Sequence, residues 1–177
     1  MGILVTSTMD RVLRFFLEHP TKEAHLRELE RTLKISLPWI RKLTSQLAAE
    51  GLLLRKRERG LVLLKARRDH ERFRALKRSA NLFALSESGL VAALTDAYNH
   101  PAAIVLFGSF ARGEDTEASD IDVVVITPRS LRSDLAAFER RLHRKIRVQE
   151  LPPKKIEKEF LNTLANGIVL AGYLEVA

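Results

Sequence analysis

The sequence of 177 residues contains no cysteine, which excludes disulfide bonds and metal sites made of thiolates. No apolar run approaches the length of about 20 residues that a membrane helix needs, and the N-terminus lacks the basic-then-apolar pattern of a secretory signal. Neither a Gly-x-Gly-x-x-Gly motif nor a Walker-type Gly-Lys-Ser/Thr motif occurs, and the five histidines lack metal-ligand spacing. We therefore expect a cytoplasmic protein with no membrane partner.

Acidic residues are scarce in the first half of the chain. Residues 1–80 carry 19 Lys and Arg against 9 Asp and Glu, whereas residues 81–177 carry 11 against 13. The net charge of +8 therefore comes from the first half. This asymmetry predicts two modules, of which the first has an anionic partner, although a basic solvated face without such a partner gives the same count.

Three helices and a hairpin are predicted in the first module. Ser7 and Asp10 have the spacing of a helix-starting capping box, with Asp in place of the usual Glu. Pro38 suits the first turn of a helix, and the apolar runs 52–54 and 61–64 flank a basic tip. The expected elements are helices at 7–18, 26–33 and 36–50 and a hairpin at 52–64.

This order resembles a winged helix-turn-helix domain, over about residues 5–66. The resemblance implies double-stranded DNA as a partner, with the third helix in the major groove. Trp39 on that helix is expected to contact either DNA or a partner domain or dimer mate, and a homodimer stays open. Winged domains also serve as protein–protein modules. The residues expected to contact DNA are Arg41 and Lys42 of the third helix and Arg55, Lys56, Arg57 and Arg59 of the hairpin.

Residues 67–85 are expected to form a helical linker between two domains, 1–66 and 86–177. Phe73, Leu76 and Ala80 lie at helical spacing among basic residues. Ser86 is a candidate N-cap for a second helix that runs to about Tyr98. We place that second helix in the C-terminal domain.

The second half is organised around a Gly-Ser turn and two nearby carboxylates. Gly108 and Ser109 follow a buried strand at 103–107, and Asp120 and Asp122 open another at 121–127. Strand residues two apart share a face, so the two carboxylates point the same way and repel each other. A cation relieves that repulsion, and Mg²⁺ typically takes one or two carboxylates together with substrate phosphates.

The pattern Phe-Gly-Ser-Phe-Ala-Arg-Gly-Glu followed by Ser-Asp-Ile-Asp resembles the signature of minimal nucleotidyltransferases of the DNA polymerase beta superfamily. The resemblance implies a small α/β fold with a short mixed sheet, so that the whole chain is a two-domain α+β protein. It also implies a nucleoside triphosphate as substrate or ligand and Mg²⁺, with room for two ions. Asp120 and Asp122 would be catalytic and metal-binding, and Gly108, Ser109 and Arg112 would bind the nucleotide.

Two segments bear on whether the site is active: the acidic loop between the Gly-Ser turn and Asp120, and the strand at 145–151. Glu114, Asp115 and Glu117 are expected to be solvated, and Arg112 contacts either a phosphate or this acidic loop. Active family members usually carry a third carboxylate on the strand at 145–151, where our alignment places Gln149. An amide cannot act as a base or add negative charge to a metal site. Glu150 is adjacent but belongs to the opposite face unless a bulge turns it.

Three functions are compatible with these residues. The first is an enzyme that transfers a nucleoside monophosphate to a hydroxyl on a protein, nucleic acid or small molecule. The second is a transcriptional regulator whose nucleotidyltransferase-like domain senses a nucleotide without transfer. The third is an interaction module of the toxin–antitoxin type in which neither site works. The resemblance also implies a toxin as a possible partner, because minimal nucleotidyltransferases paired with toxins of the HEPN class are antitoxins that modify a tyrosine on the toxin.

Overall fold

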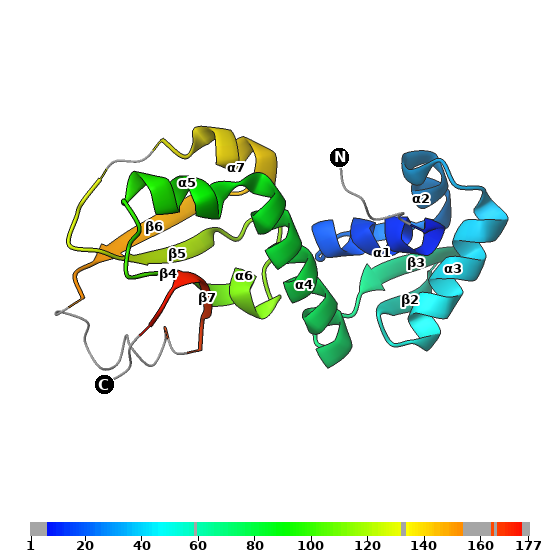
Figure 1. Ribbon diagram of the computed structural model, residues 1–177. Coiled ribbons are helices and arrows are strands. Elements are labelled where there is room, and N and C mark those ends of the chain that lie inside the picture. Colours follow the sequence, from blue (N-terminus) through cyan, green and yellow to red (C-terminus); the bar gives the residue numbers. More distant parts are fainter. Residues whose placement is uncertain (1–6, 59, 132–133, 154–163, 165, 175–177) are drawn as a thin grey trace. The chain divides into compact units, whose positions relative to one another are not determined.

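The chain is described here from a computed structural model, over residues 7–58, 60–131, 134–153, 164 and 166–174 (Figure 1). It divides into two compact units, residues 1–77 and residues 78–177, and each unit is considered by itself. Within the described ranges, every helix is too short or too polar to span a membrane.

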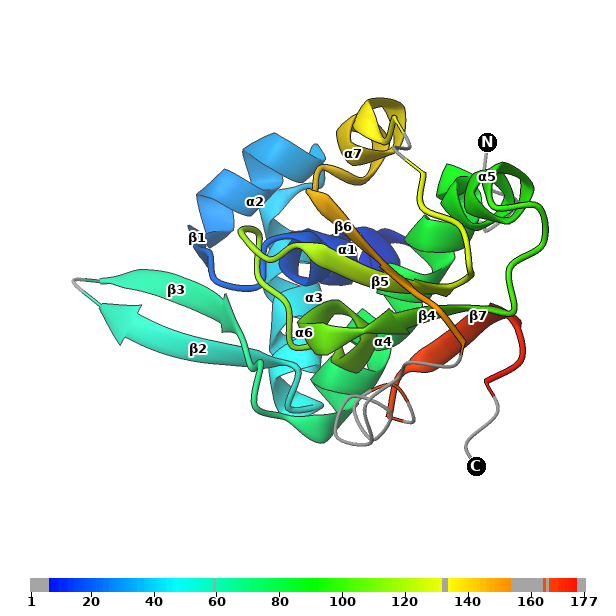
Figure 2. The same cartoon turned by 90° about the vertical axis from the view of Figure 1, so that its left-hand side faces the viewer.

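The first unit combines three helices with a small antiparallel sheet. The strand order is β1-β3-β2, and β2 and β3 form a hairpin that projects beyond the helices of this unit (Figure 2). The three predicted helices and the hairpin are confirmed, whereas β1 is a three-residue strand that no sequence pattern indicated. The elements are α1 (Thr8–Glu18), β1 (Glu23–His25), α2 (Leu26–Leu33), α3 (Leu37–Ala49), β2 (Leu53–Glu58) and β3 (Leu61–Ala66).

Local sequence explains where these helices begin and how they pack. Ser7 is the N-cap of α1: its Oγ accepts from the Asp10 backbone N–H at 3.1 Å, and its own N–H donates to the Asp10 carboxylate at 2.9 Å. Ser36 stands at the N-cap position of α3 but makes no side-chain cap, and the Leu37 N–H donates instead to Glu30 at 3.0 Å. The buried core draws on every helix of the unit, through Phe16, Leu29, Ile40 and Leu47.

Two helices follow β3, as predicted, but the break between them lies at Gly89 rather than at Ser86. Helix α4 (Glu71–Ser88) continues through Ser86 without interruption, so the prediction that Ser86 begins a new helix is wrong. Its segment contains no glycine or proline, and nothing stops the helix. Gly89 makes the break, with a φ of +78° that favours glycine, and α5 (Leu90–Ala97) follows it.

The second unit is built on a four-stranded mixed sheet with the order β6-β5-β4-β7. Strands β4 and β5 are antiparallel, β5 and β6 are parallel, and β7 is antiparallel to β4. The three predicted strands are confirmed. Apolar spacing also predicts helices at about 131–143 and 154–164; the first is present as the shorter α7, and the second lies outside the described residues except for Leu164. The elements are β4 (Ala103–Phe107), α6 (Gly108–Arg112), β5 (Ile121–Ile126), α7 (Ala136–Leu142), β6 (Ile146–Leu151) and β7 (Ile168–Gly172).

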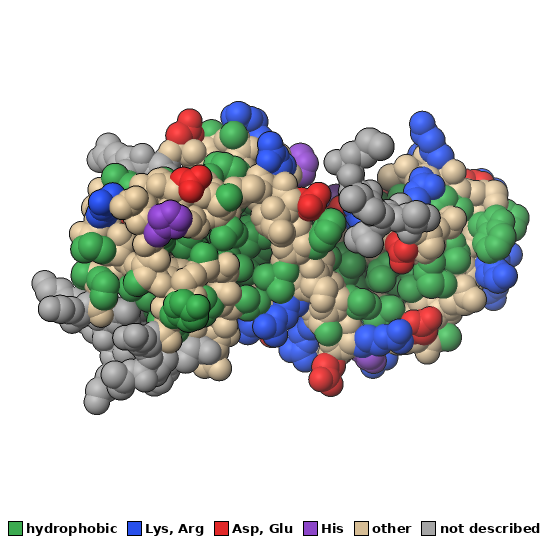
Figure 3. All heavy atoms as spheres, in the orientation of Figure 1, with side chains coloured by type: hydrophobic (Ala, Val, Ile, Leu, Met, Phe, Trp, Pro, Cys, Tyr) green, Lys and Arg blue, Asp and Glu red, His purple; other side chains and the backbone are tan. Residues whose placement is uncertain are grey.

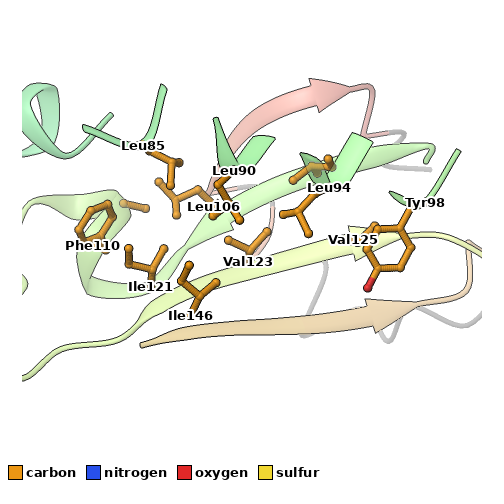
Figure 4. Close-up of a cluster of buried hydrophobic side chains, with 12 residues drawn as sticks. Leu85, Leu90, Leu94, Tyr98, Leu106, Phe110, Ile121, Val123, Val125 and Ile146 are labelled. Carbon is orange, nitrogen blue, oxygen red and sulfur yellow. The ribbon is translucent and has the colours of Figure 1, made fainter. Parts of the chain in front are cut away.

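Alternate residues of the central strands enter two different hydrophobic clusters. Ile121, Val123 and Val125 point to the face that packs against α4 and α5 (Figure 4), whereas Val124 and Ile126 belong to a smaller cluster on the opposite face. This alternation follows from the pleat of the strand. The carboxylates at 120 and 122 therefore share the face of Val124, away from the helices.

Glu150 of β6 lies on the helix-covered face, where it joins three elements. Its Oε1 accepts from the Tyr98 hydroxyl at 2.6 Å and from the Leu131 N–H at 2.7 Å, and the Tyr98 ring belongs to the cluster in Figure 4. Burial raises the pKa of Glu150, but hydrogen bonds from Ser130, Tyr98 and the Leu131 N–H outweigh it, so that the pKa lies below its usual value. The charged carboxylate is thus the form that the fold stabilises.

We expect Glu150→Gln to lower the free energy of unfolding at pH 7 by on the order of 1 kcal/mol. Because the folded pKa is depressed, the contribution of the carboxylate is complete above the unfolded value of about 4.3 and is lost as pH falls through the folded value. Urea unfolding followed by circular dichroism at pH 7 and about pH 3 should show the difference between wild type and variant shrinking in acid. Glu87→Gln, on an exposed position of α4, is the matched control. A difference that is equal at both pH values would contradict this account.

Candidate functional site

The Gly-Ser turn and Asp122 meet at one end of the sheet. Strands β4 and β5 pair so that Phe107 lies opposite Asp122, and Gly108 follows directly as the first residue of α6. Gly108 has a φ of +75°, and a Cβ added there would lie 2.7 Å from the Asp122 Oδ2. Only glycine therefore fits both the backbone conformation and the space beside the carboxylate.

Asp122 is the second residue of β5 and Asp120 directly precedes the strand, so alternation predicts that the two side chains share a face. The side chain of Asp120 is 22 % exposed, and its Oδ2 pairs with Arg147 Nη2 at 2.5 Å. Arg147 is also the residue of β6 that stands beside Asp122 in the parallel pairing. The repulsion within the carboxylate pair is thus relieved by a cation of the chain itself, which the sequence analysis did not consider.

The face of the sheet that carries Asp120 and Asp122 is called the carboxylate face. Strand β6 presents the Gln149 amide and the Arg147 guanidinium to it. Gln149 pairs with Val124, one same-face step beyond Arg147, and its side chain is exposed. The β5–β6 register is continuous from the first pair to the last, so no bulge turns Glu150 toward Asp120 and Asp122. Among the described residues, no third carboxylate of β6 joins the pair.

The other two residues predicted to bind a nucleotide lie in or at the end of the short helix α6. Ser109 is its second residue and is half-buried, and its carbonyl accepts from the Glu114 N–H at 3.0 Å. Arg112 pairs through Nε with Glu114 at 2.7 Å. Of the two contacts considered for Arg112, the structure shows the one with the acidic loop.

Asp115 is buried, contrary to the expectation that the whole acidic loop is solvated. Its carboxylate accepts from Asn81 Nδ2 at 2.7 Å and lies 3.6 Å from Arg144 Nη2. Asn81 also donates to the Phe110 carbonyl at 2.9 Å, and Arg144 to the Glu117 carbonyl at 2.7 Å. This network ties α6 and the loop before Asp120 to α4, and buried polar groups need such partners. No local pattern marked Asp115 as different from its acidic neighbours.

The donor set is suited to a divalent cation that also binds phosphate. The described residues contain no cluster of three or more His, Asp or Glu side chains that would hold a metal ion by itself. Two carboxylates on one face, with the space beside Asp122 that a Cβ at Gly108 would fill, fit an ion that takes its remaining ligands from a triphosphate and water.

The residues predicted to contact DNA lie on the surface of the first unit. Trp39 is 54 % exposed, and the Lys42 ammonium lies 4.9 Å from the centre of its ring. Over the start of α3, the space-filling view shows a hydrophobic area with Lys and Arg side chains beside it (Figure 3). Arg55 donates to Ser45 at 2.6 Å, which links the hairpin to α3. The remaining exposed candidates are Arg41, Lys56 and Arg57, and Arg59 lies outside the described residues.

Comparison with known proteins finds a similarity in the second half of the chain only. Residues 88–169 match the family model described as Nucleotidyltransferase domain, a range that contains α5, β4, α6, β5, α7 and β6 and therefore the whole carboxylate face. No curated protein and no solved structure matches the chain. Domains of this family generally use nucleotide substrates and divalent metal ions. Residues 88–169, which include Gly108 and the carboxylate pair, are thus similar to a nucleotidyltransferase domain.

Proposed function

We propose that the second unit binds a nucleoside triphosphate with Mg²⁺ and transfers the nucleoside monophosphate to a hydroxyl acceptor. The observation that carries the proposal is that the Asp122 carboxylate lies close against Gly108, where an added Cβ would come within 2.7 Å of Oδ2. Both residues lie inside the segment that matches a nucleotidyltransferase domain. Asp120 on the same face supplies a second carboxylate. In the reaction, the acceptor oxygen forms a bond to the α-phosphorus, the bond from the α-phosphorus to the α–β bridging oxygen breaks, pyrophosphate leaves with that oxygen, and the hydroxyl proton passes to solvent water.

Each residue of the site has a role that follows from its chemistry. Asp120 and Asp122 would hold the metal ion, which when bound offsets the charge of the triphosphate. Gly108 leaves the backbone open to close approach by a phosphate, and Ser109 offers a hydroxyl donor. Arg112 would exchange its exposed pair with Glu114 for a phosphate, since such a pair contributes little stability.

A regulator that binds nucleotide without transfer is the second candidate. Gln149 cannot accept the proton of an attacking hydroxyl, and Arg147 already pairs with Asp120. Both observations favour slow or absent chemistry. An interaction module of the toxin–antitoxin kind would need neither nucleotide nor transfer. If the partner toxin were itself the acceptor of the nucleoside monophosphate, this candidate would be the same as the first proposal.

The basic unit is proposed to bind double-stranded DNA as a winged helix-turn-helix domain. The order of α1, α2 and α3 followed by the β2–β3 hairpin supports this assignment, as do exposed Trp39, Arg41 and Lys42 on α3. Lys56 and Arg57 on the projecting hairpin would contact phosphates, as Arg55 would on release from Ser45. Such contacts are mostly electrostatic and are independent of base sequence.

Transfer is tested with α-labelled ATP, GTP, CTP and UTP, Mg²⁺ and a cell lysate as the source of acceptors. We expect label on an acceptor, reduced about a hundredfold or more by Asp120→Asn or Asp122→Asn, comparable to loss of one electrostatic contact to a transition state. Asp96→Asn, at an exposed position of α5, should transfer like wild type. Nucleotide binding without label transfer would support the sensor, and transfer that survives both carboxylate variants would reject this site.

DNA binding is tested by mobility shift on a mixed-sequence duplex at several salt concentrations. We expect affinity to fall steeply with salt, and Arg57→Ala to weaken binding several-fold and to reduce the salt slope by about 1, because one phosphate contact is lost. Arg14→Ala removes the same charge from an exposed position of α1 and should bind like wild type. No shift at low salt, or an equal loss in both variants, would reject DNA binding through the hairpin.

A further inference from the structure

A guanidinium from the neighbouring strand lies within the carboxylate face. The parallel register sets Arg147 beside Asp122, and the Arg147 side chain reaches Asp120 at 2.5 Å. The two cations just before β6 have acidic partners of their own, since Lys145 pairs with Glu139 at 3.0 Å and Arg144 with Asp115 at 3.6 Å. Arg147 is thus the cation that this part of the described chain directs at Asp120.

The negative charge of the face is already reduced from two to one without a metal ion, because Arg147 pairs with Asp120. Arginine keeps its positive charge at every physiological pH, so it offsets one carboxylate wherever it remains in place. A divalent ion bound by Asp120 and Asp122 would share the Asp120 carboxylate with the guanidinium and would lie close to it. The divalent ion and the guanidinium are both positive, so they repel each other at close range, and the repulsion is larger in the reduced dielectric near a protein surface than in water.

The exposure of the two side chains allows the Arg147–Asp120 ion pair to dissociate. The Arg147 side chain is 74 % exposed, whereas Asp120 is 22 % exposed. The guanidinium therefore reaches in from solvent and can return there, while the carboxylate stays held at the start of β5. Exposed ion pairs of this kind exchange partners easily because water compensates for the lost contact.

We infer that Arg147 is a resident counter-cation that competes with the divalent ion for Asp120 and so weakens metal binding. The inference rests on the proposed role of Asp120 and Asp122 as metal ligands. The ion enters only when the guanidinium leaves Asp120. The intrinsic affinity of the domain for a divalent ion is therefore set by this exchange rather than by the two carboxylates alone.

The test is the affinity of the full chain for Mn²⁺ without nucleotide, measured by the electron paramagnetic resonance signal of the free ion. We expect Arg147→Gln to bind Mn²⁺ about tenfold more tightly than wild type, because a nearby positive charge is removed. Arg147→Lys keeps a positive charge at this position and should stay within about threefold of wild type. Arg129→Gln makes the same change in net charge beyond the opposite end of β5, at an exposed position, and should leave the affinity unchanged.

Several results would overturn the inference. These are an Arg147→Gln variant that binds Mn²⁺ no more tightly than wild type, an equal gain in Arg129→Gln, or no Mn²⁺ binding by any variant. Adding Asp120→Asn to Arg147→Gln should remove the increase in Mn²⁺ affinity. If the increase persists in the double variant, the ion does not bind at Asp120 and the inference is wrong. Because no nucleotide or acceptor is present, a gain in Mn²⁺ affinity without label transfer would mean that the proposed transfer fails while the counter-cation stands.

Discussion

The pairing of β4 with β5 is the constraint on which the site depends. It sets the end of one strand against the start of the other, so that Gly108 and Asp122 become neighbours although the chain between them passes through a helix and a loop. Alternation along β5 then gives Asp120 the same face. The opposite face carries Val123 and Val125 into the core against the helices, and sliding the register by one residue would bury the carboxylates.

The charges of Asp120, Asp122 and Arg147 are the second constraint on the site. Two like charges on one strand face raise the free energy of the fold unless a cation is near. The sequence suggested a metal ion for that role, whereas the structure supplies Arg147 from β6. The catalytic interpretation therefore does not follow from the carboxylate pair alone. It depends on Gly108, on the space beside Asp122 and on the match of residues 88–169 to a nucleotidyltransferase domain.

The first unit shows how far local patterns can lead. Its helices begin and end at residues with recognisable roles, such as Ser7 at the start of α1 and Lys34 in the left-handed conformation after α2. The same reasoning failed at Ser86, because a residue able to cap a helix does not interrupt one that has no other reason to stop. Strand β1 escaped prediction because three residues carry too little pattern, and its pairing with β3 exists only after folding.

By itself, the sequence determined the strands and the turn of the second unit, the shared face of Asp120 and Asp122, and the basic character of the first unit. These properties depend on residue type and on spacing along the chain, so they can be read locally. Only the tertiary structure decided that Asp115 is buried with Asn81 and Arg144, that Glu150 faces Tyr98, and that Arg147 stands beside Asp122. Each of these contacts joins residues that are 25 or more positions apart, and their meeting depends on sheet register and helix packing, which no local spacing encodes.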